Sequence, residues 1–132
     1  MAHKIAEIKG MEAAIVAKLA TAQITTVEQL LAQAGTAAER NALSKQLGVS
    51  SSQLTEWVNR ADLMRLKGVG TEMANLLEEG GVDSCKELQH RVPANLQAKL
   101  KGINDEKKIT HHAPTLAQIE AWINEAATFA AS

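Results

Sequence analysis

The chain has 132 residues, 45% of them apolar, which is enough to fill one compact core or two very small ones. A net charge of −1 gives no support for a strong, non-specific nucleic-acid binder, and a single cysteine, Cys85, excludes an internal disulfide and suits a reducing compartment. The amino terminus lacks the pattern of a secretory signal and no apolar run is long enough to span a membrane, so we expect a cytoplasmic protein.

Abundant Ala, Leu, Glu, Lys and Gln, with only eight Gly and two Pro, predict an all-α fold. Helix starts are indicated by a Ser or Thr followed three residues later by Glu or Gln, because each side chain caps a backbone amide of the other. This pattern begins at Thr25, Thr36, Ser50, Ser84 and Thr115. Left-handed glycines are expected to end helices at Gly35, Gly48 and the pair Gly80 and Gly81.

In chain order we expect helices at about 2–7, 12–22, 26–34, 37–47, 51–63, 71–79, 84–91, 93–103 and 115–130. Pro93 is expected in the first turn of its helix, where the missing amide costs little. The polar segment 104–114 is expected to be the longest connection.

A five-residue pattern occurs twice. Ile8-Lys9-Gly10-Met11-Glu12 returns 58 residues later as Leu66-Lys67-Gly68-Val69-Gly70, and a helix with Trp57 is echoed 65 residues later by one with Trp122. Repetition at such a period indicates one supersecondary unit used more than once. We therefore expect a single compact domain built from two pseudo-repeats, about 1–63 and 64–132, with both Trp side chains in the core.

The second copy of this pattern resembles the helix-hairpin-helix motif. A tight turn between two helices needs backbone angles that Gly adopts freely, and it leads into a helix start whose amides suit a phosphate oxygen. The resemblance implies contact with the DNA backbone without reading of the base sequence. The residues expected to make this contact are Arg65, Lys67, Gly68, Val69 and Gly70, with Arg60, Lys99 and Lys101 as supporting basic residues.

The first copy departs from this motif at its last position. Glu12 replaces the second Gly, and its carboxylate would stabilise the helix start but repel a phosphate at the same amides. We expect the first hairpin to serve the architecture, or to face a protein rather than an anion. For the second hairpin two interpretations stay open: phosphate binding, or glycines that only permit close packing of helices.

Taken as a whole, the chain is similar to an uncharacterised bacterial family catalogued as a domain of unknown function with helix-hairpin-helix character. The residues that carry this similarity are Ile8–Gly10, Ile24–Leu31, Leu54–Arg65 and Lys67–Gly70. The similarity implies a tandem helical fold, and it implies no reaction because the family has none assigned.

Basic residues are concentrated in segment 86–112, which contains six Lys or Arg against three Asp or Glu. This segment is either a continuous anion-binding strip beside the second hairpin or an ordinary solvated face. Cys85, His111 and His112 lack the spacing of a metal site, and no catalytic set of side chains or nucleotide-binding loop is recognisable. We therefore expect no enzyme activity, no cofactor and no metal.

The sequence supports two functional hypotheses. The first is a non-catalytic module that binds the backbone of double-stranded or branched DNA weakly and without sequence preference, through the second hairpin. The second is a protein-interaction or scaffold module that does not bind nucleic acid, which the acidic balance and Glu12 favour. Neither hypothesis involves a membrane or a small-molecule substrate.

Overall fold

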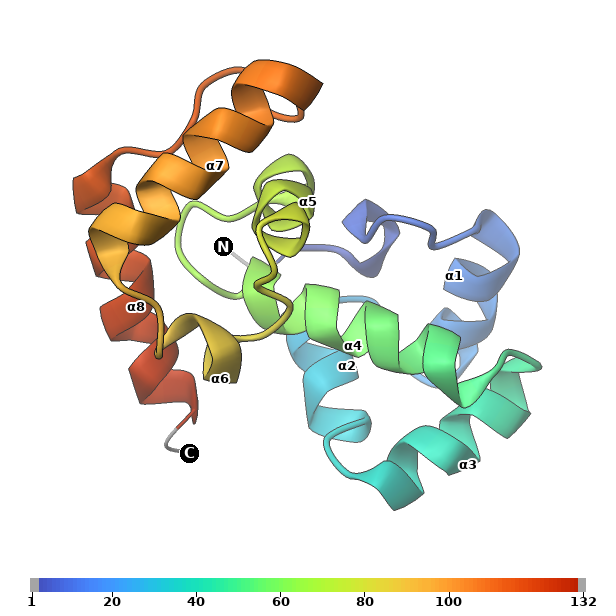
Figure 1. Cartoon of the computed structure of the whole chain (residues 1–132). Coiled ribbons are helices and arrows are strands. Elements are labelled where there is room, and N and C mark those ends of the chain that lie inside the picture. The colour runs from blue at the N-terminus through green and yellow to red at the C-terminus, as the bar shows by residue number, and fades with distance from the viewer. Residues whose placement is uncertain (1–2, 131–132) are drawn as a thin grey trace. The chain divides into compact units, whose positions relative to one another are not determined.

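A computed structural model describes residues 3–130, which form helices and one isolated bridge between Lys4 and Thr26, with no strand in this range. The prediction of an all-α fold is confirmed. The chain divides into two compact units, Met1–Arg65 and Leu66–Ser132 (Figure 1). That the two units make one domain stays a prediction, and each unit is described by itself.

The first unit contains the 3-10 helix η1 (Ile5–Glu7) and the helices α1 (Ala13–Thr21), α2 (Val27–Gln33), α3 (Ala37–Leu47) and α4 (Ser51–Met64). Helix α4 packs against α2 and α3, and α1 packs against α3 and η1. The core between them is apolar, with Leu19, Ile24, Leu30 and Leu54 completely buried. A hydrogen bond of 3.1 Å from the Ile5 amide to the Thr25 carbonyl ties η1 to the loop before α2.

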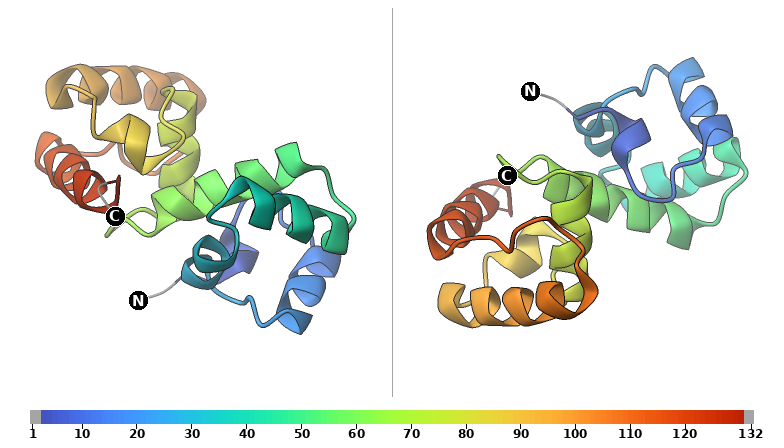
Figure 2. Two further views of the ribbon diagram at one scale, coloured as in Figure 1. Left: turned by 90° about the horizontal axis from the view of Figure 1, so that it is seen from below. Right: turned by 90° about the horizontal axis from the view of Figure 1, so that it is seen from above.

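The second unit contains α5 (Thr71–Glu79), α6 (Cys85–Leu88), α7 (Pro93–Lys107) and α8 (Leu116–Ala130). Helix α8 packs against α6 and α7, and α5 packs against α7, an arrangement that both views in Figure 2 show. Each of these pairs has a counterpart in the first unit, where α4 contacts α2 and α3, and α1 contacts α3. The core again consists of completely buried apolar side chains, among them Leu76, Leu77, Val82 and Leu100.

The last helices of the two units, α4 and α8, are called here the closing helices. Trp57 on α4 and Trp122 on α8 are each only 3% exposed, so the prediction that both Trp side chains lie in the core is confirmed. Cys85, in the first turn of α6, is 1% exposed and therefore packs as an apolar side chain.

Most helix starts have the predicted caps. The hydroxyls of Thr36, Ser50, Ser84 and Thr115 accept hydrogen bonds from the backbone amide three residues later. The prediction at Thr25 is wrong by one residue, because Thr26 is the cap of α2 and exchanges bonds of 3.2 Å with Gln29. The side chain of Gln29 also accepts from the Thr25 amide at 2.7 Å, so one glutamine satisfies two consecutive amides.

Left-handed backbone ends helices at Gly48 (φ 72°) and Gly81 (φ 89°), as predicted. Gly35 and Gly80 do not have positive φ, which corrects the expectation for these two positions. In the loop after α1 the left-handed position is taken by Gln23 (φ 64°), where the second unit has Gly81.

Of the helix expected at 2–7, the described residues form only the 3-10 helix η1, and residue 2 lies outside the described range. Two further helices differ clearly in length from the expected ranges. Helix α6 ends at Leu88 rather than near residue 91, because the amides of His90 and Arg91 donate to carbonyls three residues earlier and so tighten the chain into a turn. Helix α7 continues to Lys107, into the segment expected to be a connection. Its extension is held by Asn104, whose side chain donates to the Thr110 carbonyl at 3.1 Å and accepts from the Thr110 amide at 2.8 Å.

The turn after α5 provides a test of packing in the second unit. A Cβ added to Gly80 would lie 2.6 Å from Leu100 Cδ2, whereas one added to Gly102 on α7 would meet nothing within 4 Å. We expect Gly80→Ala to lower the free energy of unfolding by about 1–3 kcal/mol through overpacking. We expect Gly102→Ala to raise it by about 0.5–1 kcal/mol by restricting the unfolded chain. Urea unfolding followed by circular dichroism measures both, and equal effects would contradict the packing of α5 on α7.

Candidate nucleic-acid interface

The second hairpin is a turn anchored by two apolar side chains. Leu66 and Val69 are buried, whereas Lys67 and Gly68 between them are exposed. The Val69 amide donates to the Leu66 carbonyl at 3.1 Å, and this turn requires φ of +87° at Gly68. Gly70 is the N-cap of α5, so the exposed turn leads directly into a helix start.

Two side chains of the closing helix α8 form hydrogen bonds with the backbone of this turn. Trp122 Nε1 donates to the Lys67 carbonyl at 2.8 Å. Glu125 Oε1 accepts from the Lys67 amide at 2.9 Å. Glu125 follows Trp122 by three residues and so lies on the same side of the helix. Sequence reasoning missed both contacts, although the Trp echo between the two halves pointed to α8.

The Glu125 contact changes which donors the second hairpin offers. The amides of Lys67 and Val69 are already used within the unit. Among the described residues, no acceptor reaches the amides of Gly68 and Gly70. Two backbone donors at the positive end of α5 therefore stay available to an anion, beside a carboxylate that would repel it.

The first hairpin has the same turn. The Met11 amide donates to the Ile8 carbonyl at 3.1 Å, and Gly10 has φ of +84°. Trp57 Nε1 lies 3.6 Å from the position that a Cβ on Gly10 would take, close to the 3.8 Å between Trp122 Nε1 and the same position on Gly68. Trp57 Nε1 nevertheless has no hydrogen-bond partner among the described residues.

Two carboxylates lie near the first hairpin in sequence. Glu12 is the N-cap of α1, but its side chain is exposed and makes no capping hydrogen bond. Glu7 accepts from the Lys4 amide at 2.7 Å, and this bond, with a smaller contribution from His3, lowers the pKa of Glu7 below its ordinary value. Glu7 therefore stays ionised through the neutral range, and its carboxylate is directed to Lys4.

The predicted basic residues are divided between the two units. Arg60 lies on α4 and Arg65 caps its end, and Arg65 Nη2 donates to Asp62 Oδ1 within that helix. Lys99 Nζ lies 3.9 Å from the Cβ position of Gly81, in the turn after α5 and thus at the end of α5 opposite to Gly70. Lys101 is exposed on α7. Of these residues and the hairpin itself, Lys67 is the cation within the turn.

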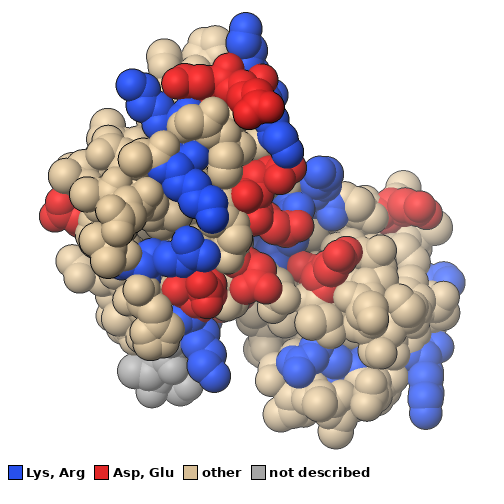
Figure 3. Space-filling model, viewed as in Figure 1, with Lys and Arg blue, Asp and Glu red and all other residues tan. Residues whose placement is uncertain are grey.

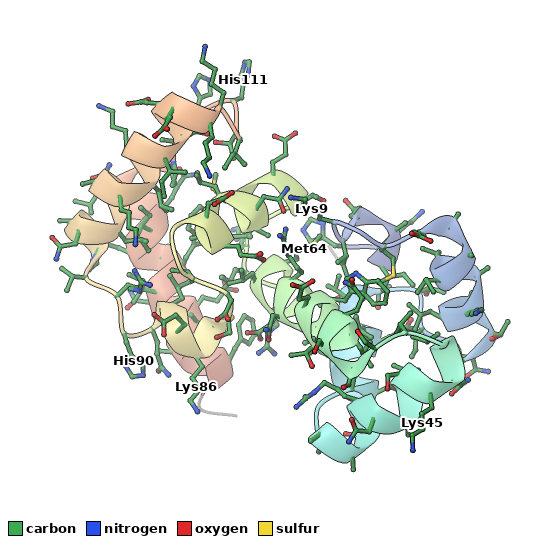
Figure 4. All side chains as sticks on the ribbon, turned by 45° about the vertical axis from the view of Figure 1, so that its right-hand side comes forward. Lys9, Lys45, Met64, Lys86, His90 and His111 are labelled. Carbon is green, nitrogen blue, oxygen red and sulfur yellow. The ribbon has the colours of Figure 1, made fainter. Side chains whose placement is uncertain are left out.

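Segment 86–112 does not form one strip. Arg91 bonds Glu87 at 3.0 Å and the Gly81 carbonyl at 3.0 Å, and Lys107 bonds Glu79 at 3.2 Å. Figure 4 places Lys86 and His90 beside α6, at the end of the second unit away from His111. On the face seen in Figure 3, positive and negative side chains alternate over this unit.

One part of the segment does reach the second hairpin. Two grooves of about 510 and 530 Å³ lie at the start of α5 and share Glu72, Thr110 and His111 in their walls. The first is also lined by Asn104, Asp105, Lys108 and Ile109, and the second by Gly70, Thr71, Met73 and His112. The loop after α7 thus brings His111 and His112 to the groove that Gly70 lines, while Lys108 and Asp105 line the neighbouring groove.

Among the described residues no three His, Cys, Asp or Glu side chains are placed to bind a metal ion together. No helix in the described range is both long and apolar enough to cross a membrane.

The chain belongs to the family described as Domain of unknown function (DUF4332), whose model matches residues 9–129. No curated protein and no solved structure matches the chain significantly.

The two Trp side chains allow the hydrogen bond beneath the second hairpin to be measured. Trp122→Phe and Trp57→Phe remove the same ring atoms from equally buried positions, but only Trp122 loses a hydrogen bond. We expect Trp122→Phe to lower the free energy of unfolding by about 1 kcal/mol more than Trp57→Phe. Urea unfolding of the two variants gives this difference, and equal losses would show that the Trp122 bond contributes nothing net.

Proposed function

We propose that this member of a family without an assigned function is a non-catalytic, tandem helix-hairpin-helix protein that binds the nucleic-acid backbone weakly through its second hairpin. The supporting observation is the exposed turn at Lys67 and Gly68, where the amides of Gly68 and Gly70 have no acceptor among the described residues. Backbone amides at a helix start favour a phosphate oxygen. Contacts to phosphates carry no sequence information, so binding has no base preference.

The proposed binding is weak because the hairpin already holds a carboxylate. The Glu125 carboxylate accepts a hydrogen bond from the Lys67 amide, and Glu72 is in the first turn of α5. A phosphate at Gly68 and Gly70 therefore meets two negative charges as well as Lys67. The net charge of −1 adds no long-range attraction to compensate.

In this proposal, the bound nucleic-acid strand continues from the turn along the groove at the start of α5. Gly70, Thr71, His111 and His112 all line this groove, together with Glu72. Lys108 lines the adjoining groove. Cationic and ring side chains of this kind follow a phosphate backbone in many binding grooves. The proposal includes double-stranded and branched DNA as ligands and places the protein in the cytoplasm, where a lone thiol such as Cys85 stays reduced.

One observation favours the second hypothesis, a protein-interaction or scaffold module. Glu125 satisfies the Lys67 amide within the unit, as a hairpin kept only for architecture would require. Val92 (57% exposed) and Leu116 (38% exposed) are the large apolar side chains that the described part of the chain exposes to solvent. The following experiment distinguishes the two functions.

Substitution of Glu125 tests the proposed interface directly. Glu125→Gln keeps an acceptor for the Lys67 amide and removes the charge, so we expect duplex DNA to bind roughly fivefold more tightly at low salt. Lys67→Glu and Gly70→Glu are expected to weaken duplex binding, because each adds a carboxylate at the proposed phosphate site. Fluorescence anisotropy with a short labelled duplex measures the affinities, and each phosphate contact adds about 0.9 to the slope of log affinity against log salt concentration.

Glu120→Gln is the matched control, because it removes an exposed charge from the same helix, α8, away from the hairpin contacts. It should leave the affinity unchanged. An absence of binding to every duplex at low salt would favour the scaffold function instead. Equal binding by the wild type, Lys67→Glu and Gly70→Glu would overturn the second-hairpin interface.

A further inference from the structure

Among the described residues, two donors that are hydrogen-bonded in the second hairpin have no acceptor in the first: the amide of the Lys and the indole nitrogen of the Trp. The amides of Lys9 and Gly10 have no acceptor among the described residues. Beneath the turn, Trp57 is 3% exposed and its Nε1 has no partner. Lys9 and Gly10 are exposed, so their amides are open to a ligand, whereas the buried Trp57 Nε1 costs free energy because it has no acceptor in the described part of the chain.

The second hairpin shows which group completes such a turn. There a carboxylate oxygen lies 2.9 Å from the Lys67 amide, and the Lys67 carbonyl accepts from Trp122 at 2.8 Å. Both turns have the same backbone hydrogen bond of 3.1 Å and nearly the same glycine φ. A turn of this geometry therefore accepts an anionic oxygen on its Lys amide, and Glu125 is the example within the chain.

The closing helix of the first unit carries the opposite charge at the corresponding place. Arg60 follows Trp57 by three residues, as Glu125 follows Trp122. Position three after a buried Trp lies on the same side of the helix. By this spacing the Arg60 side chain leaves α4 on the side where Glu125 leaves α8, so this position of α4 supplies no carboxylate for the Lys9 amide.

The two carboxylates that precede and follow the turn leave these amides open. Glu12 makes no capping hydrogen bond from its exposed side chain, and Glu7 bonds the Lys4 amide. Glu12 is the reason for expecting this hairpin to be purely architectural, but an exposed, unbonded side chain can turn away from an incoming anion at little cost.

We infer that the first hairpin is a second phosphate site, in which an oxygen of a nucleic-acid backbone accepts from the Lys9 and Gly10 amides. The bound oxygen takes the role at Lys9 that Glu125 has at Lys67, and Arg60 and the Lys9 side chain contribute positive charge. The Lys9 carbonyl and the Gly10 amide belong to one planar peptide group and point in opposite directions, so an anion that draws the Gly10 amide outward turns the Lys9 carbonyl toward Trp57 Nε1. The choice of nucleic acid as the source of the oxyanion rests on the proposed function, whereas the site itself rests on the first unit alone.

Nuclear magnetic resonance of the full, 15N-labelled chain tests this inference residue by residue. The probes are a short duplex of mixed sequence and a polyglutamate peptide. With the duplex, we expect saturable shifts of the Lys9 and Gly10 amides and a downfield shift of the Trp57 indole proton, while the Trp122 indole proton stays in place.

Arg60→Glu is the decisive variant, because it copies the arrangement of Glu125 into the first unit. It should weaken the affinity for the duplex, measured from the shifts at Lys9 and Gly10, by roughly tenfold. This factor corresponds to one charge-assisted hydrogen bond. Arg60→Lys keeps the charge and should bind within a few-fold of the wild type. In each variant without ligand, amide signals of the first unit outside the hairpin that match those of the wild type show that this unit is folded.

The outcomes separate this inference from the proposed function. Shifts at Lys9 and Gly10 without shifts at Gly68 and Gly70 would support the first-hairpin site and overturn the proposed second-hairpin interface. Shifts at Gly68 and Gly70 alone, unchanged binding at Lys9 in Arg60→Glu, or shifts at Lys9 with polyglutamate and none with the duplex would each overturn the inference.

Discussion

The structure of each unit depends on a glycine turn placed directly over a buried indole ring. The turn needs a positive φ at Gly10 or Gly68, and the ring of Trp57 or Trp122 lies within 4 Å of the space a side chain would occupy there. The closing helix therefore has to pass the hairpin at one fixed distance and with one rotation about its own axis. The contacts of the closing helix with its two neighbouring helices fix that rotation, so the hairpin and the unit's core determine each other.

Much of this arrangement could be predicted from the sequence because it depends on local rules. Helix starts at Thr36, Ser50 and Ser84 follow from side chains that bond an amide three residues away. The burial of both Trp side chains follows from their helical spacing among apolar residues. The extension of α7 did not follow, since it depends on a bond between Asn104 and Thr110 that only the folded loop creates.

The candidate site was less predictable than the fold, because its chemistry comes from residues distant in the sequence. Lys67 and Glu125 are separated by 58 residues, and no motif at either position indicates their hydrogen bond. The basic segment 86–112 is continuous in sequence, but α7 separates its charges along the length of α5. A run of basic residues in the sequence of a helical protein therefore does not predict a continuous basic surface. The residue three positions after each Trp, Arg60 or Glu125, is what distinguishes the two hairpins in sequence.

The positions of the two indole rings also make the protein its own optical probe. The chain contains no Tyr, and each unit has one Trp in direct proximity to its hairpin. Ultraviolet emission therefore comes from two buried sites, one hydrogen-bonded and one not, without a tyrosine background. Excited-state lifetimes and quencher access in single-Trp variants can follow each turn separately, with no attached dye to disturb so small a surface.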